Sequence, residues 1–221
     1  MREKGLVSSL AHETAGIVVG AALRTYNRLT VIGADRLPTR PPFVLVANHT
    51  SHLDALILAA TLSREARDSA YCVAAGDAFF ESVGVAAATT ILFNALPLWR
   101  KKVTSHTLQG LRERLESGHT GLIIFPEGAR SRDGLPLRFK PGVGMLVSES
   151  SIPVYPCHID GAFQALAPGV RMPRPVRITV RVGTPLTFQS LHNSREGWNQ
   201  VANQIRESVA VLSPHPWPIV E

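Results

Sequence analysis

Apolar and polar segments alternate along the chain in a way that predicts strands followed by helices. Two short apolar runs, residues 43–47 and 121–125, end abruptly in polar residues, which is typical of buried strands that deliver polar groups to their carboxyl ends. Further strands are expected over residues 31–33, 71–75, 95–98, 153–159 and 176–182, and helices over residues 53–62, 78–92, 103–116, 142–150 and 195–211. This order predicts an α/β fold with one largely parallel or mixed sheet flanked by helices.

The first 30 residues are expected to form a separate N-terminal helix ahead of one domain over residues 31–221. Residues 6–29 are apolar at helical spacing, but charged and polar side chains interrupt them, so they lack the ~20 consecutive apolar residues of a membrane-spanning helix. No long apolar core of a signal peptide follows Arg2 and Lys4. Two interpretations stay open: the helix lies on a membrane surface, or it packs on its own domain. Its broad apolar side would consist of Leu6, Val7, Leu10, Ile17, Val18, Ala21 and Ala22.

The polar turn that follows the first buried strand carries candidate chemistry. Ser51 or His52 is expected to lie near the N-cap of the next helix, with Asp54 in its first turn, where a carboxylate is favoured. Reactive groups collect at the carboxyl ends of strands in open α/β sheets, so His49 and Asp54 can meet as a general base and the acid that orients it. Such a base could activate a hydroxyl of the substrate itself. Asn48 and His52 are expected to shape the turn. In an alternative interpretation, His49 only caps the turn and Asp54 only caps the helix.

A second polar turn, residues 126–132, follows the second buried strand. Together the two turns resemble the glycerolipid acyltransferases of the lysophosphatidic acid acyltransferase family. His49 and Asp54 match that family's H-x4-D box, and residues 125–131 match its F-P-E-G-T-R-S box, with Ala129 in place of the usual Thr. The resemblance therefore joins two stretches of the chain that the strand pattern already sets at strand ends.

Two further blocks follow the family's order. Residues 98–100 match the family's second box, which lies between the H-x4-D and F-P-E-G-T-R-S boxes and ends in Arg. Residues 152–156 match the late V-P-I-x-P box. Four boxes in order, over roughly residues 31–185, make the resemblance specific. The second box, residues 94–100, lacks the usual Gly and the acidic residue before the Arg. This departure and Ala129 both fall where the acceptor should bind.

The resemblance implies a glycerolphosphate acyltransferase-like fold and a role in phospholipid biosynthesis. The expected reaction moves a fatty acyl group from acyl-CoA or acyl-carrier protein to a hydroxyl of a lysophospholipid-type acceptor, foremost 1-acyl-glycerol-3-phosphate. By resemblance, Arg100, Glu127, Gly128 and Arg130 belong to acceptor binding. Arg130 can make forked bonds to phosphate and Gly128 allows close backbone approach. Glu127 is expected to hold an acceptor hydroxyl or to position Arg130, and a surface ion pair of these two residues is the alternative.

Other functions remain as alternatives to this one. The acceptor could be another lipid, an amino-acid lipid or a glycolipid, and a non-catalytic lipid-binding protein could use the same scaffold. A metallohydrolase with His49, His52 and Asp54 as ligands would need a further ligand that the sequence does not supply convincingly, so no metal is expected. No cofactor is expected either.

Composition and charge narrow the range of partners that the protein is expected to bind. The net charge of +6 favours anionic partners: lipid headgroups, a phosphorylated acceptor or coenzyme A. Nucleic acid is not expected, because the chain has no Lys/Arg-rich run, zinc pattern or aromatic stacking motif of the usual kinds. Cys72 and Cys157 show no metal spacing and suggest no disulfide framework. These features predict a cytoplasmic protein that is peripheral on the inner face of the membrane.

Overall fold

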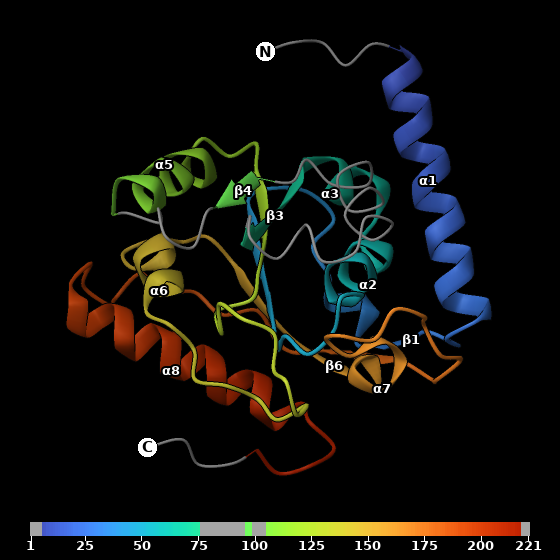
Figure 1. The fold of residues 1–221 in the computed structure, drawn as a ribbon. Coiled ribbons are helices and arrows are strands. Elements are labelled where there is room, and N and C mark those ends of the chain that lie inside the picture. Colours follow the sequence, from blue (N-terminus) through green and yellow to red (C-terminus); the bar gives the residue numbers. More distant parts are fainter. Residues whose placement is uncertain (1–5, 76–95, 99–104, 218–221) are drawn as a thin grey trace.

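A mixed β-sheet runs through the middle of the molecule (Figure 1). The computed structural model describes residues 6–75, 96–98 and 105–217. Within these residues the sheet has seven strands in the order β1-β7-β6-β2-β5-β3-β4. Their bounds are β1 Thr30–Ile32, β2 Phe43–Ala47, β3 Ala70–Ala75, β4 Leu96–Leu98, β5 Gly121–Ile124, β6 Val154–Asp160 and β7 Thr179–Val182. All neighbouring pairs are parallel except β6 and β7, which confirms the predicted sheet.

Helices cover both faces of the sheet. Figure 1 shows α5, α6 and α8 on one side, and α1, α2, α3 and α7 on the other. Their bounds are α1 Leu6–Thr25, α2 Asp54–Thr61, α3 Arg64–Ser69, α5 Ser105–Glu116, α6 Gly142–Val147, α7 Ala162–Leu166 and α8 Arg195–Val211, and a 3-10 turn spans Ala34–Arg36. None of the helices in the described ranges is long and apolar enough to cross a membrane.

The two strands that precede the polar turns, β2 and β5, are neighbours in the centre of the sheet. Every residue of both strands is buried. Alternate residues of β2 point to opposite faces, so Leu45 joins the core beneath α2 while Val44 joins the core beneath α5, α6 and α8. Gly121 of β5 faces Phe43 of β2, and a Cβ at Gly121 would collide with that ring. Because the strands are parallel neighbours, their polar turns meet at one edge.

Most of the predicted elements are present, with shifts at their ends. The predicted strand 176–182 begins at Thr179, and its alternation is confirmed by the burial of Val180 and Val182. The helix predicted over residues 142–150 ends at Val147, because Ser148 is extended. Helices α3 and α7, of six and five residues, were not predicted. The helix expected over residues 78–92 lies outside the described residues.

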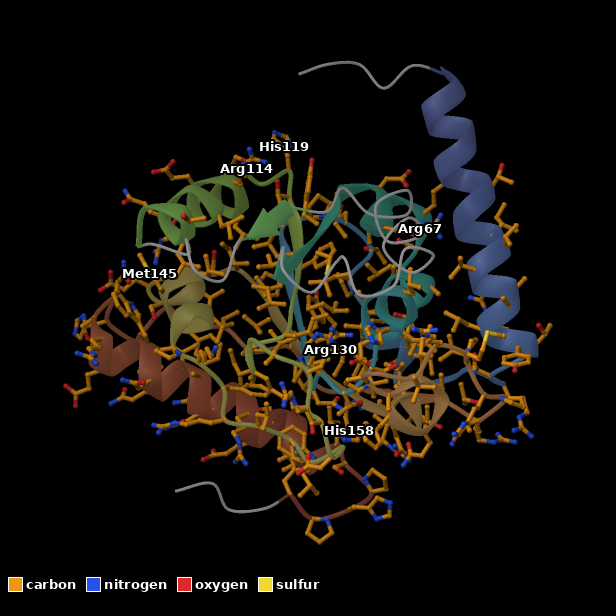
Figure 2. The ribbon with its side chains drawn as sticks, viewed as in Figure 1. Arg67, Arg114, His119, Arg130, Met145 and His158 are labelled. Carbon is orange, nitrogen blue, oxygen red and sulfur yellow. The ribbon has the colours of Figure 1, made fainter. Side chains whose placement is uncertain are left out.

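Helix α1 packs on its own domain through one narrow side. Gly16, Gly20 and Leu23 are buried and face α2 and α3. Arg67 of α3 lies against this side (Figure 2), where a Cβ at Gly16 would be 3.1 Å from its guanidinium carbon. Among the described side chains, those that pack are thus not on the apolar side expected from the sequence. Among the described side chains of that apolar side, Ile17 and Val18 are exposed.

Candidate active site

The turn after β2 is fixed to the neighbouring strand β6 by Asn48. Its side-chain amide donates a hydrogen bond to the carbonyl of Ile159 over 3.0 Å and accepts one from the Ile159 N–H over 2.8 Å. Both bonds are buried, so they hold the first residue of the turn in a single position. Asn48 therefore shapes the turn, as expected from its place in the sequence.

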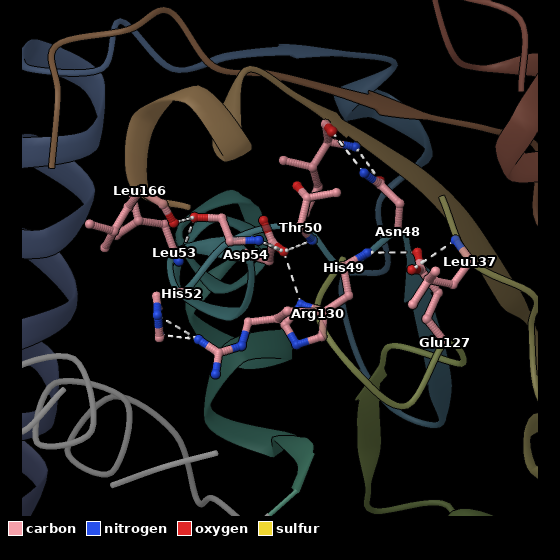
Figure 3. Close-up of polar contacts among 12 residues, drawn as sticks. Asn48, His49, Thr50, His52, Leu53, Asp54, Glu127, Arg130, Leu137 and Leu166 are labelled. Atoms are coloured by element: carbon pink, nitrogen blue, oxygen red, sulfur yellow. Dashed lines mark hydrogen bonds and ion pairs between the residues drawn. The ribbon is translucent and has the colours of Figure 1, made fainter. Parts of the chain in front are cut away.

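The next residue, His49, is hydrogen-bonded to Asp54 (Figure 3). Nδ1 of His49 lies 2.9 Å from Oδ2 of Asp54. The carboxylate is fully buried, whereas the imidazole is 20% exposed. The same Oδ2 accepts the N–H groups of Thr50 over 2.7 Å and Ser51 over 2.8 Å. A carboxylate held in this way favours the tautomer with the proton on Nδ1, which leaves Nε2 as the basic nitrogen.

Helix α2 begins directly after the polar turn, as the sequence predicted. Leu53, not Ser51 or His52, is the N-cap residue, and it makes no side-chain cap bond. Ser51 and His52 thus lie within two residues of the N-cap, as expected. Ser51 Oγ accepts the Leu53 N–H over 3.1 Å and donates to the Leu166 carbonyl over 2.8 Å, while the Asp54 carboxylate accepts the amides of the turn. Asp54 does lie in the first turn of α2, as predicted.

The turn after β5 holds the backbone of His49 from two sides. Oε1 of Glu127 accepts the His49 N–H over 2.9 Å, and the Ser131 N–H donates to the His49 carbonyl over 2.8 Å. The ring of Phe125 stacks on the His49 imidazole, with centroids 4.2 Å apart and planes 18° apart. The two turns thus form one assembly in which the imidazole has few ways to move.

Glu127 is a buried residue of this assembly. Its second oxygen, Oε2, accepts the Leu137 N–H over 3.1 Å, so the carboxyl group joins three segments of the chain. Burial raises the pKa of Glu127 to about 8, although the bonds from the His49 and Leu137 amides oppose this shift. The carboxyl group is therefore directed at backbone amides rather than outward.

Arg130 lies beside the turn that carries the imidazole. Its Nη1 contacts both ring nitrogens of His52 and is 2.6 Å from Nε2 (Figure 3). A guanidinium carries only hydrogen-bond donors. The bond therefore requires an acceptor nitrogen on His52, which only the neutral imidazole provides. Arg130 is half-buried, and this contact places it on the same rim as His49.

Gly128 provides the backbone conformation of the second turn. Its φ of +69° lies in the left-handed region, where L side chains are strained. A Cβ at this position would also come within 2.6 Å of Nζ of Lys140. The left-handed backbone favours glycine here, whereas the end of the flexible Lys140 side chain could shift to make room.

A family model described as "Acyltransferase" matches residues 28–160, which include both turns. The chain belongs to the acyltransferase family.

Several acyltransferase relatives are similar over part of their length. The chain is 45% identical over 65 residues to 1-acyl-sn-glycerol-3-phosphate acyltransferase from Limnanthes douglasii, a match that covers 29% of this chain and 23% of the relative. It is 25% identical over 189 residues to 1-acyl-sn-glycerol-3-phosphate acyltransferase alpha from Mus musculus, covering 84% of this chain and 63% of the relative. The chain thus spans about a quarter to under two thirds of these relatives.

The fold resembles a solved acyltransferase structure. The crystal structure of the 1-acyl-sn-glycerophosphate (LPA) acyltransferase PlsC from Thermotoga maritima superposes with a TM-score of 0.68 over 97% of this chain and 85% of that chain. The sequence identity is 22%, so the likeness concerns the fold. It agrees with the glycerolphosphate acyltransferase-like fold expected from the sequence.

The site of this acyltransferase-family chain contains residues that the sequence did not single out. Thr50 and Leu137 act through their backbone amides, which leaves no side-chain signal to find them. The sequence places Ser51 near the helix N-cap, but it does not predict the amide bond of Ser51 to Asp54. Arg100, expected at the acceptor, lies outside the described residues. In the part of the chain that is described, no group of three or more His, Cys, Asp or Glu side chains is arranged to hold a metal ion.

Proposed function

We propose that this protein transfers a fatty acyl group from an acyl thioester to a hydroxyl of a lysophospholipid, with 1-acyl-glycerol-3-phosphate as the acceptor. The observation that carries the proposal is the 2.9 Å hydrogen bond between His49 and the buried Asp54 at the carboxyl end of β2. Membership of the acyltransferase family and the names of the relatives support the same reaction. The donor is acyl-CoA or acyl-carrier protein.

In the proposed reaction, Nε2 of His49 removes the proton from the acceptor hydroxyl. The hydroxyl oxygen attacks the thioester carbonyl, so a C–O bond forms and the carbonyl oxygen becomes an oxyanion. The C–S bond then breaks, and the imidazolium returns its proton to the leaving thiolate. Asp54 keeps the imidazole in the productive tautomer and stabilises its positive charge, because its carboxylate stays bonded to Nδ1.

The second turn is proposed to bind the acceptor's anionic group. Arg130 is the residue whose side chain suits a phosphate, since its planar fork matches two phosphate oxygens. Gly128 lets the backbone approach the ligand, and Arg100 is proposed to add positive charge. We assign Glu127 to positioning, because both of its oxygens accept backbone N–H groups of the site.

The proposal also assigns roles to the two parts of the chain. We assign acyl transfer to residues 31–221 and a membrane-surface role to the N-terminal helix, at the inner face of the membrane. Two exposed apolar side chains of α1, Ile17 and Val18, support this assignment. The net charge of +6 also supports it, because the cytoplasmic leaflet is negatively charged.

A product analysis tests the reaction. The purified protein is incubated with acyl-CoA or acyl-carrier protein and with a panel of acceptors, and the products are read by mass spectrometry. We expect diacylated glycerol phosphate with the wild type and none with His49→Ala. If product forms only when an amino-acid lipid or a glycolipid is the acceptor, the acceptor is reassigned. The presence of Ala129 in place of the family's usual Thr would explain such a change in acceptor. Tight lipid binding without turnover of any thioester would instead identify a lipid-binding protein.

A further inference from the structure

The segment that follows α8 turns back along that helix (Figure 1). The N–H groups of Leu212 and Ser213 donate to carbonyls in the last turn of α8, which starts the reversal. The Ser213 hydroxyl then accepts the His215 N–H over 3.2 Å, and two prolines flank that residue. Proline fixes one backbone angle, so few conformations are available to this part of the chain. We call residues 212–217 the return segment.

Trp217 attaches the return segment to three other elements. Its ring lies edge-on to that of Phe139, with ring centroids 6.2 Å apart, and its centroid is 5.9 Å from that of His158 on β6. The guanidinium carbon of Arg206, on α8, is 5.4 Å from the centre of the Trp217 ring. Aromatic pairs and cation–π contacts of this kind each add to stability. Trp217 therefore packs as part of the domain, although it lies beyond α8.

One contact of Trp217 adjoins the anchor of the first polar turn. His158, near the carboxyl end of β6 (Figure 2), is followed by Ile159, whose N–H and carbonyl both bond to the side chain of Asn48. Asn48 directly precedes His49, so the position of this part of β6 determines where the imidazole lies. His158 is buried, and its Nδ1 has no hydrogen-bond partner within the described ranges. Packing, including that of Trp217, therefore holds its ring.

Another contact adjoins the anchor of the second polar turn. Phe139 directly precedes Lys140, whose N–H donates to the Pro126 carbonyl over 2.9 Å. Pro126 precedes Glu127, whose carboxyl group accepts a backbone N–H of the first turn. Phe139 itself is buried in the core beneath α5, α6 and α8. The Trp217 ring thus lies one residue from an anchor of each turn.

Arg206 connects the return segment with the second turn electrostatically. Burial raises the pKa of Glu127 to about 8, and the charge of Arg206 is one of the weaker influences that oppose this shift. The same guanidinium lies over the Trp217 ring. One side chain of α8 is thus within electrostatic reach of the buried carboxyl group and in contact with the return segment.

We propose that Trp217 is a positioning residue for acyl transfer, because its ring holds β6 and the chain ahead of α6 where the two turns meet around His49. Trp217 acts through His158 and Phe139 rather than on the reacting groups. A general base must lie within hydrogen-bond reach of the hydroxyl that it activates, so a small displacement of either turn lowers the rate. The effect on rate rests on the proposed function, whereas the effect on the position of the turns does not.

Matched variants separate positioning from plain stability. Trp217→Ala removes the ring, and Trp217→Phe keeps an aromatic ring at the same place. Trp198→Ala is the control, because Trp198 is also half-buried but lies near the start of α8, where its Nε1 donates to Asn193 over 2.6 Å. If Trp217→Ala does not fold, Trp217→Leu takes its place, since leucine keeps an apolar side chain without an aromatic face.

Hydrogen exchange followed by mass spectrometry measures the positioning without any substrate. Trp217→Ala should speed exchange of the Ile159 and Lys140 amides roughly tenfold, because aromatic and cation–π contacts beside them are lost. Exchange in β3 should match the wild type. Trp198→Ala should leave both amides unchanged, and Trp217→Phe should recover most of their protection. Equal acceleration in the Trp198 control, or throughout the domain, would reveal a general loss of stability and overturn the proposal.

Acyl-transfer kinetics connect the positioning with the rate. The kcat of Trp217→Ala should fall about ten- to a hundredfold, since displacing reacting groups by about 1 Å can cost a factor on the order of 10². The donor KM should change little, Trp217→Phe should recover most of kcat, and Trp198→Ala should keep it. Wild-type kcat in a folded Trp217→Ala protein would overturn the positioning role. A wild type that transfers no acyl group, with faster exchange of both amides in Trp217→Ala, would refute the proposed function and leave the positioning of the turns intact.

Discussion

Two buried carboxyl groups reach the same histidine from opposite turns, and they contact different parts of it. Asp54, from the turn after β2, bonds to the imidazole ring of His49, whereas Glu127, from the turn after β5, bonds to its backbone N–H. Asp54 receives three hydrogen bonds on one oxygen, and Glu127 receives one on each. One carboxyl group can thus act on the charge of the ring, and the other only on its position.

The difference between them indicates that burial beside the proposed base, His49, does not by itself give a carboxyl group a chemical role. Burial dominates at Glu127 and raises its pKa to about 8. A group that holds its proton into the neutral range, and that faces two amides, is suited to fix the geometry of the turn. Substitutions of Asp54 and Glu127 should therefore have different effects on activity and stability.

The largest expected effect in this comparison belongs to Asp54→Asn. An amide can still hold the ring, but it cannot stabilise the imidazolium, so turnover should fall by a factor on the order of 10²–10⁴. Both KM values should stay near those of the wild type. Steady-state kinetics against donor and acceptor separately give the answer. A defect confined to the acceptor KM would move Asp54 from catalysis to binding.

Arg130→Lys is expected to have the next largest effect. A lysine offers a point charge in place of a fork, and losing a charge-assisted contact costs about 1.5–3 kcal/mol, or roughly ten- to a hundredfold in acceptor KM. The donor KM should change little. Arg132→Lys, an exposed position two residues on, is the matched control and should resemble the wild type. If the donor KM rises instead, Arg130 reads the phosphates of the coenzyme or carrier.

Much of the fold could be predicted from uninterrupted patterns in the sequence. The role of Asp54 is a prediction from its place at a strand end, and that of Arg130 is a prediction from the family resemblance. Strand β2 and helix α8 have the predicted bounds, because an apolar run and a long amphipathic repeat each leave a clear signal. The short helices α3 and α7 leave none. The bond of Ser51 to Leu166 could not be predicted either, since the two residues lie more than a hundred residues apart in the chain. The burial of Glu127 was equally hidden, because its partners are backbone amides.

Glu127→Gln should affect stability more than chemistry. An amide has a single oxygen, so one of the two N–H groups, that of His49 or of Leu137, would face an NH₂ donor instead. We expect a loss of about 1–3 kcal/mol in the free energy of unfolding and a smaller loss of turnover. Chemical denaturation checks this. Asp133→Asn is the control, because Asp133 accepts two bonds in the same loop but is exposed, and its loss should be smaller.

The pH dependence of stability sharpens the same test. Burial raises the pKa of Glu127 from 4.5 to about 8, so between these values the unfolded carboxyl group is ionised while the folded one keeps its proton. This contribution to the free energy of unfolding is fully present below pH 4.5 and is lost as the pH rises through about 8. Glu127→Gln should remove this part of the slope. An unchanged slope would mean that Glu127 is already ionised in the folded protein.

The smallest expected effect concerns His52. Its neutral ring accepts a hydrogen bond from Arg130, so His52→Phe should loosen the guanidinium and raise the acceptor KM by roughly two- to tenfold. His52→Asn retains an acceptor and should recover part of this loss. Turnover at saturation should hold in both variants. A fall in turnover with no change in KM would connect His52 to the base rather than to Arg130.

The rate of acyl transfer by His49→Ala tests the central claim most directly. The variant is purified, its fold and thermal stability are compared with those of the wild type, and single-turnover transfer from acyl-CoA to 1-acyl-glycerol-3-phosphate is followed by mass spectrometry. If His49 is the general base oriented by Asp54, a folded variant should lose at least a factor on the order of 10²–10⁴ in rate. A folded His49→Ala protein that transfers acyl groups at nearly the wild-type rate would contradict it.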